Sequence, residues 1–139
     1  MEILQPELLQ ENLNTLVAAA CFHDLGIRTH DTLDYLPPSI ESAKKWIEQH
    51  ALDNSPEKIT MIIDNHHKIT SHKDPLTELF RKADWIDVTW GVLRFGLSRK
   101  QINSIYSIFP DNGFHKRLTQ LSFRELLRHP LRPVPIFRW

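Results

Sequence analysis

Residues 16–27, LVAAACFHDLGI, form an apolar run that ends in a histidine, an aspartate and a glycine. Apolar residues recur along this run and before it at steps of three and four, which is the spacing of one face of a helix. His23 and Asp24 lie three and four residues after Ala20, so they continue the apolar face rather than a polar one. We therefore expect a buried helix face that ends in two polar side chains. The apolar part of this face consists of Leu9, Leu13, Leu16, Val17 and Ala20.

The same pattern occurs on two later segments. A run of isoleucines leads by helical steps to His66 and the adjacent His67. In the next predicted helix, apolar residues lead by the same steps to Asp84 and, three residues later, to Asp87. Three separate predicted helices therefore carry histidine or aspartate on faces that are otherwise apolar.

Such side chains need a partner, because burying a lone carboxylate costs several kcal/mol. Imidazole and carboxylate ligands together suit a divalent metal, which would compensate Asp24 and Asp84 at once. Each residue alone also has an ordinary interpretation. His23 could be a core histidine at a helix end, and Asp84 could pair with Arg81 or Lys82.

The whole chain predicts an all-α protein of one domain, residues 1–139, with no repeat and no linker. We expect a polar turn over residues 28–36, and helix starts at Ser39, at Ser55-Pro56, at Asp74-Pro75 and at Ser98. The expected helices span about 6–24 (stopped by Gly26), 39–50, 56–67, 75–93, 98–106 and 114–127, with a proline-rich tail after them.

Composition excludes several classes of protein. Lys plus Arg and Asp plus Glu are both 17, so no basic excess points to nucleic acid as a partner. No apolar run reaches the roughly 20 residues that a membrane span needs. The single cysteine, Cys21, excludes a disulfide framework, and its alanine neighbours predict a buried position. We expect a cytoplasmic protein without a membrane partner.

Three segments resemble the HD-domain superfamily of metal-dependent phosphohydrolases. Residues 21–27, CFHDLGI, resemble the family's His-Asp turn, and residues 82–87, KADWID, resemble its later A-D-x-x-D helix. Residues 63–67, IDNHH, resemble the intervening helix that ends in one or two histidines. The order of the three motifs is that of the family, and the resemblance covers about residues 7–95.

The resemblance implies an HD-domain-like helical bundle that binds a divalent metal (manganese, iron, cobalt, nickel, zinc or magnesium). It implies His23, Asp24 and Asp84 as metal ligands around a metal-activated water. Asp24 would also be catalytic as the proton acceptor or a bridging ligand. His66 and His67 would be catalytic residues that bind phosphate or a second metal.

The family's activity implies hydrolysis of a small phosphorylated, nucleotide-like substrate. Lys68 and Arg81 are candidates for pairing with the phosphate charge, because they lie near the motifs in sequence. Asp87 is a further candidate for substrate binding.

One feature departs from the family. Its pattern begins with a histidine on a helix before the His-Asp turn, and no histidine precedes His23. The chain could be a shortened product in which Met1 is an internal methionine, which we favour. It could instead use His66 or His67 as a substitute ligand, or be a non-catalytic HD-scaffold module for binding or regulation. A missing helix would leave apolar surface on the first helix present, which favours a homodimer.

Overall fold

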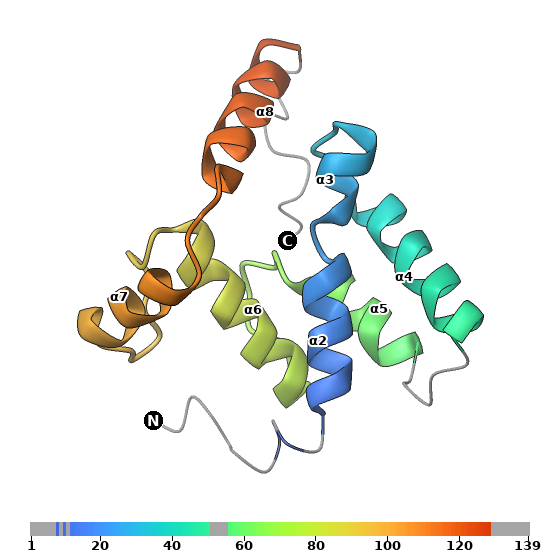
Figure 1. The fold of residues 1–139 in the computed structure, drawn as a ribbon, viewed down its shortest axis with the longest axis horizontal. Helices are drawn as coiled ribbons and strands as arrows, with labels where there is room; N and C mark the ends of the chain where they lie inside the picture. Colours follow the sequence, from blue (N-terminus) through green and yellow to red (C-terminus); the bar gives the residue numbers. More distant parts are fainter. Residues whose placement is uncertain (1–7, 9, 11, 51–55, 129–139) are drawn as a thin grey trace.

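The structure is a computed structural model that describes residues 8, 10, 12–50 and 56–128. These residues are all-helical, with no strand among them, which confirms the expected all-α class. None of the described helices combines the length and apolar character needed to cross a membrane. The helices are α2 (Leu13–Phe22), α3 (Leu25–His30), α4 (Leu36–His50), α5 (Pro56–Asn65), α6 (Pro75–Val88), α7 (Arg99–Ile108) and α8 (Phe114–Arg128) (Figure 1).

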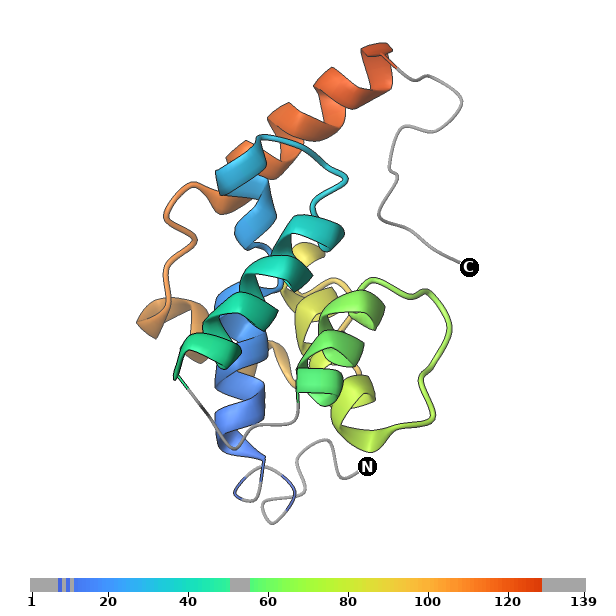
Figure 2. The same ribbon diagram turned by 90° about the vertical axis from the view of Figure 1, so that its right-hand side faces the viewer.

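Helices α2 to α6 pack around one apolar core. Helix α5 is central, because it contacts α2, α4 and α6, while α4 also contacts α2 and α3 (Figure 2). It contributes Ile59, Ile62 and Ile63, which are all fully buried. Helix α2 presents Ala18 and Ala19 to this core, and such short side chains allow helices to approach closely. The core therefore fixes the ends of α2, α5 and α6 relative to one another.

Helices α7 and α8 extend away from this bundle (Figure 1). Ile102 of α7 and Leu121 of α8 are 1% and 2% exposed and are the buried apolar residues of these two helices. Arg117 and Arg124 of α8 also pair with Asp31, the residue that follows α3. The second half of the chain is thus attached at a few points.

The region of the His-Asp turn differs from our expectation. Helix α2 ends at Phe22 and a second helix, α3, begins at Leu25, so Gly26 lies inside a helix instead of stopping one. A Cβ at position 26 would collide with the carbonyl oxygen of Tyr35. Glycine is needed here because two segments of backbone approach closely.

The start of α4 also differs. The helix begins at Leu36, and Pro37 and Pro38 lie in its first turn, where proline is tolerated because these backbone N–H groups have no helical acceptor. Ser39 is therefore not the N-cap that we expected. Its hydroxyl accepts a hydrogen bond from the Gly26 N–H at 2.9 Å, which joins α3 to α4.

The exposed face of α2 corrects two further expectations. Leu13 and Val17 are 51% and 52% exposed, and Ala20 and Cys21 are also exposed, so three residues of the expected apolar face and the cysteine are not buried. Leu16 of that face is partly buried against the core, and Leu9 lies outside the described residues. The helix buries the face of Ala18 and Ala19 because that face meets α5. The homodimer stays a prediction.

Several helix ends agree with the sequence. Asp74 caps α6 through the Thr77 N–H at 2.9 Å, and Ser98 forms a capping box with Gln101 at the start of α7. Helix α6 ends at Val88, five residues before the expected end, because residues 90 and 91 adopt positive φ of 53° and 66°. The expected start near Pro6, the cap at Ser55 and the tail 129–139 lie outside the described residues.

Candidate metal centre

The ends of α2 and α5 meet the middle of α6 and bring five predicted side chains together. His23 and Asp24 follow the last residue of α2, His66 and His67 follow α5, and Asp84 lies within α6. They form two overlapping groups, His23–Asp24–Asp84 and Asp24–His66–His67, in each of which the ligand atoms lie within 4.8 Å of one another. The predicted metal ligands and the paired histidines therefore share one cluster.

The two carboxylates lie between the histidines. Asp24 Oδ2 is 3.3 Å from His23 Nε2, and Asp24 Oδ1 is 3.7 Å from His66 Nε2. Asp84 Oδ1 is 3.7 Å from His23 Nε2, and Asp84 Oδ2 is 3.2 Å from His67 Nδ1. Each carboxylate thus directs one oxygen to His23 and the other to one of the paired histidines.

The backbone fixes the orientation of two of the rings. His23 Nδ1 lies 2.8 Å from the Ala20 carbonyl oxygen, and His66 Nδ1 lies 2.7 Å from the Ile63 carbonyl oxygen. A carbonyl oxygen only accepts, so both rings carry a proton on Nδ1 and donate it. Each ring therefore directs Nε2 into the cluster, which is how a histidine is prepared to bind a metal.

Polar atoms in the cluster lack partners. Asp24 Oδ1, His66 Nε2 and Asp84 Oδ2 are buried and make no hydrogen bond within the part of the chain that the structure describes. His66 is 0% exposed and Asp84 is 9% exposed, so solvent does not readily satisfy them. Buried polar atoms without partners are rare in folded proteins, and a divalent ion fits these oxygen and nitrogen donors.

The two cationic partners suggested by the sequence lie elsewhere. Arg81 pairs with Glu78 at 2.7 Å, and Lys82 lies 3.4 Å from Glu78 as well. Within the described ranges, the ion pairs of Asp84 are with histidines. The interpretation of Asp84 as a carboxylate neutralised by Arg81 or Lys82 is therefore wrong.

Charge coupling in the cluster is strong. Burial opposes the charge on His23, but the adjacent carboxylates of Asp24 and Asp84 outweigh it and raise the pKa of His23 to about 9. Burial likewise opposes the charge on Asp24, yet His23 and His66 hold its pKa well below the ordinary value. Burial lowers the pKa of His66. Protonated His23 thus balances the carboxylates, and an ion that bound there would displace this proton.

Tyr35 is a member of the cluster that the sequence analysis missed. It lies just before α4, is 1% exposed, and its hydroxyl is hydrogen-bonded to His67 Nε2. Burial, then Asp24 and Asp84, raise the pKa of its phenol. A tyrosine within an expected polar turn carries no periodicity that points to a buried site, so no sequence pattern predicts its position in the cluster.

The three predicted substrate-binding residues border the cluster. Arg81 is buried, with its guanidinium on Glu78 and on the Lys68 carbonyl oxygen at 3.1 Å, so it holds the segment after His67 against α6. The side chain of Lys68 is partly exposed. Asp87 lies one turn after Asp84, and burial raises the pKa of its carboxyl. Substrate binding by these residues stays a prediction.

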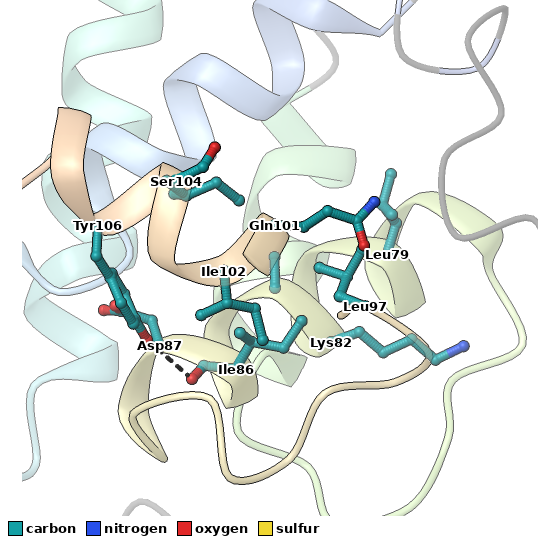
Figure 3. A pocket seen from close by; sticks show the side chains of 11 residues that line it. Leu79, Lys82, Ile86, Asp87, Leu97, Gln101, Ile102, Ser104 and Tyr106 are labelled. Atoms are coloured by element: carbon teal, nitrogen blue, oxygen red, sulfur yellow. Dashed lines mark hydrogen bonds between the residues drawn. The ribbon is translucent and has the colours of Figure 1, made fainter. Parts of the chain in front are cut away.

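A pocket of about 460 Å³ lies between α6 and α7 (Figure 3). Asp87 and Tyr106 line one part of it, and the Tyr106 hydroxyl donates to the Ile86 carbonyl oxygen at 3.3 Å. Asp87 also interacts electrostatically with Asp84, so this pocket adjoins the cluster through one helix turn. Most of the other lining residues are apolar, among them Leu79, Ala83, Leu97, Ile102 and Ile105.

No protein-family model, no curated protein and no solved structure matches this chain. The chemistry of the cluster is therefore argued from its residues. Three histidines and two aspartates from three segments of the chain, with their ligand atoms turned toward one another, define a candidate metal centre.

Proposed function

We propose that this chain is a cytoplasmic metal-dependent phosphohydrolase of the HD-domain type. The observation that carries the proposal is the buried cluster, in which Asp24 Oδ1, His66 Nε2 and Asp84 Oδ2 have no hydrogen-bond partner in the described chain. Such atoms are costly unless a ligand satisfies them. The resemblance of the three sequence motifs to HD-domain proteins agrees with this chemistry.

The ligand set supports a specific assignment. His23, Asp24 and Asp84 would hold a divalent ion, since one ligand atom from each lies within 4.8 Å of the others. His66 and His67, with the second oxygen of Asp24, form an adjoining group that would bind a phosphate or a second ion. Mixed imidazole and carboxylate donors accept manganese, iron, cobalt, nickel, zinc or magnesium.

The side chains of the cluster suit hydrolysis of a phosphate ester. When bound, a divalent ion supplies a Lewis acid that lowers the pKa of a water molecule and screens phosphate charge. Asp24 Oδ1, a buried acceptor without a hydrogen bond, would receive the proton of the attacking water. The new bond would join the water oxygen to phosphorus, the bond between phosphorus and the ester oxygen would break, and the leaving oxygen would take up the proton that Asp24 received.

The pocket between α6 and α7 suggests where the organic part of the substrate lies. Its lining is mostly apolar and includes Asp87, which is one turn from Asp84. A flat apolar ring with a few polar edges, as in a nucleobase, fits such a lining. We therefore propose a small, nucleotide-like phosphate ester as the substrate.

Elemental mass spectrometry of the purified chain tests the proposal. The wild type and Asp84→Ala are each incubated with manganese, iron, cobalt, nickel and zinc, and unbound metal is removed. We expect near-stoichiometric metal in the wild type, its loss in the variant, and hydrolysis of at least one ester in a phosphatase and nucleotidase screen. Absence of metal from the folded wild type would contradict the proposal.

The alternative is a non-catalytic module that keeps the HD scaffold for binding or regulation. The observation that favours it is the composition of the His23–Asp24–Asp84 group, to which a single histidine contributes. This alternative predicts no turnover with any metal, and ligand binding that survives replacement of His23 and Asp24. The same screen, repeated on these variants, separates the two functions.

A further inference from the structure

His67 differs from the other two histidines of the cluster in what holds its ring. His23 and His66 each contact a backbone carbonyl of their own helix. His67 Nε2 contacts the hydroxyl of Tyr35, a side chain 32 residues earlier in the chain. The two rings meet edge to face, with their centroids 6.0 Å apart.

We propose that Tyr35 is a positioning residue of the metal centre, whose hydroxyl oxygen accepts the Nε2 proton of His67, so that Nδ1 carries the lone pair that would bind the second ion. This role rests on the proposed metal centre. It concerns His67, a member of the Asp24–His66–His67 group. The Nδ1 atom of His67 also lies 3.2 Å from Oδ2 of the neighbouring Asp84. Tyr35 would touch neither the ion nor the substrate.

The geometry of the ring decides which way the hydrogen bond runs in the proposed centre. A phenol can donate or accept, so its contact with His67 alone does not fix the proton. His67 directs Nδ1 to Asp84, at 3.2 Å from Oδ2, and Nε2 to the Tyr35 hydroxyl. A neutral imidazole carries one proton, so a His67 that binds an ion through Nδ1 carries it on Nε2 and donates it to the phenol oxygen.

Burial makes this contact matter. Tyr35 is 1% exposed and His67 is 5% exposed, so water does not readily take the place of the hydroxyl. A group that hydrogen-bonds the far nitrogen of a metal-binding histidine fixes both its proton and its orientation, and losing it typically weakens metal binding about 10–100-fold. Tyr35→Phe removes this oxygen and keeps the ring.

The chain offers a matched control in Tyr106, its only other tyrosine. Its hydroxyl donates to the Ile86 carbonyl oxygen at 3.3 Å, on the pocket side of α6 (Figure 3). Tyr106→Phe therefore deletes the same atom outside the cluster. Both variants are checked for folding by thermal melting in the presence of a chelator.

The experiment is a titration of the full chain with Co²⁺, followed by its visible absorption. We expect Tyr35→Phe to bind Co²⁺ about 10–100-fold more weakly than the wild type, with an altered absorption spectrum. Tyr106→Phe should match the wild type in both. A Tyr35→Phe variant that melts at a lower temperature yet keeps the wild-type affinity and spectrum would overturn the positioning role.

A second measurement needs no variant, in case Tyr35→Phe does not fold. Nitrogen NMR of the zinc-loaded wild type, labelled with ¹⁵N at histidine, reports which ring nitrogen of His67 carries the proton. We expect Nε2, and a proton on Nδ1 overturns the inference while the metal centre stands. A wild type that binds neither Co²⁺ nor zinc overturns the metal centre, and this role with it.

Discussion

Two regions of the molecule are built in different ways. The α2–α6 bundle, residues 13–88, closes around a core centred on α5, and its helix ends converge on the histidine–aspartate cluster. The α7–α8 arm, residues 89–128, has only sparse contacts between its helices and the bundle. Its anchors are Ile102, Leu121 and the pairing of Asp31 with α8.

Exposed apolar surface is concentrated in the arm. A site that holds buried charges needs fixed neighbours, and the cluster lies in the bundle, whose helices contact one another around the core. The arm instead carries exposed apolar surface, of the kind through which proteins bind a partner. Its exposed apolar residues are Trp90, Val92, Leu93, Ile105, Ile108, Phe109, Phe123, Leu126 and Leu127, against Leu13, Val17 and Ile69 in the bundle.

The largest effect that we expect comes from the core. Ile62 is 0% exposed, whereas Ile105 of the arm is 48% exposed. Ile62→Ala should lower the free energy of unfolding by about 2–5 kcal/mol, because it removes buried atoms and leaves a cavity. Ile105→Ala should change it by less than about 0.5 kcal/mol. Urea unfolding measures both, and equal losses would contradict the division into two regions.

The next largest effect is on metal affinity, and it compares an aspartate of the bundle with an aspartate of the arm. Asp24→Asn keeps the shape of the side chain but removes a charge that both ligand groups share. We expect metal affinity to fall about 100-fold or more, as for removal of a direct ligand. Asp24 makes no side-chain cap for α3, but its charge is paired with protonated His23, so the metal-free variant should also unfold at a lower urea concentration than the wild type.

The control for this variant lies in the arm. Asp111→Asn removes a carboxylate that pairs with His115 and that belongs to neither ligand group. Its metal affinity, measured by the same calorimetric titration, should equal that of the wild type. If both aspartates changed metal affinity alike, the ion would not be bound by the cluster.

The bundle also shows what periodicity can reveal. The three- and four-residue spacing along apolar helix faces predicted which polar residues would converge. A polar residue that continues such a face lies on the side of the helix that packs against other helices, so it is directed toward the core. Arg81 was treated as a substrate ligand because sequence distance was the only guide. In space it is paired with Glu78 and holds the chain after His67.

Other features depend on contacts between distant segments. The buried face of α2 could not be chosen from its own sequence, since apolar residues lie on both sides and the contacts with α5 and α4 determine which side is buried. In the sequence, Gly26 fits the pattern of a helix stop. In the structure, glycine is needed there because the backbone of Tyr35 lies too close to leave room for a side chain. Tyr35 lies just before α4, and its hydroxyl contacts His67 of the cluster. No local sequence pattern predicts the path of the backbone that brings it there.

Acid should weaken the bundle through Glu78. Arg81 pairs with this carboxylate, and although partial burial opposes ionisation, its pKa is lowered from 4.5 to about 2. Because the unfolded chain takes up the proton first, the stability from this pairing is complete above about pH 4.5 and is lost as pH falls toward 2. We expect a contribution of about 2 kcal/mol at neutral pH, discounted for partial exposure.

Urea unfolding between neutral pH and about pH 3 checks this contribution. Glu78→Gln should be less stable than the wild type at neutral pH, and the difference should shrink as pH falls. Glu41→Gln, which removes an exposed partner of Lys45 on α4, should leave the pH dependence unchanged. A constant difference between wild type and Glu78→Gln at all pH values would show that the charge of Glu78 is not responsible.

The smallest effect concerns the attachment of the arm to α3. Asp31 pairs with Arg117 and, at 2.6 Å, with Arg124, and all three side chains are open to solvent. Asp31→Asn keeps a residue type that tolerates its φ of 51° and removes only the charge. Since exposed ion pairs contribute little and are screened by salt, global stability should hardly change.

Hydrogen exchange of the α8 amides should nevertheless become faster in the variant at low salt, and the difference should vanish near 1 M salt, where the Debye length is about 3 Å. Faster exchange that persists at high salt would mean that apolar contacts around Leu121, and not charge, hold α8 to the bundle.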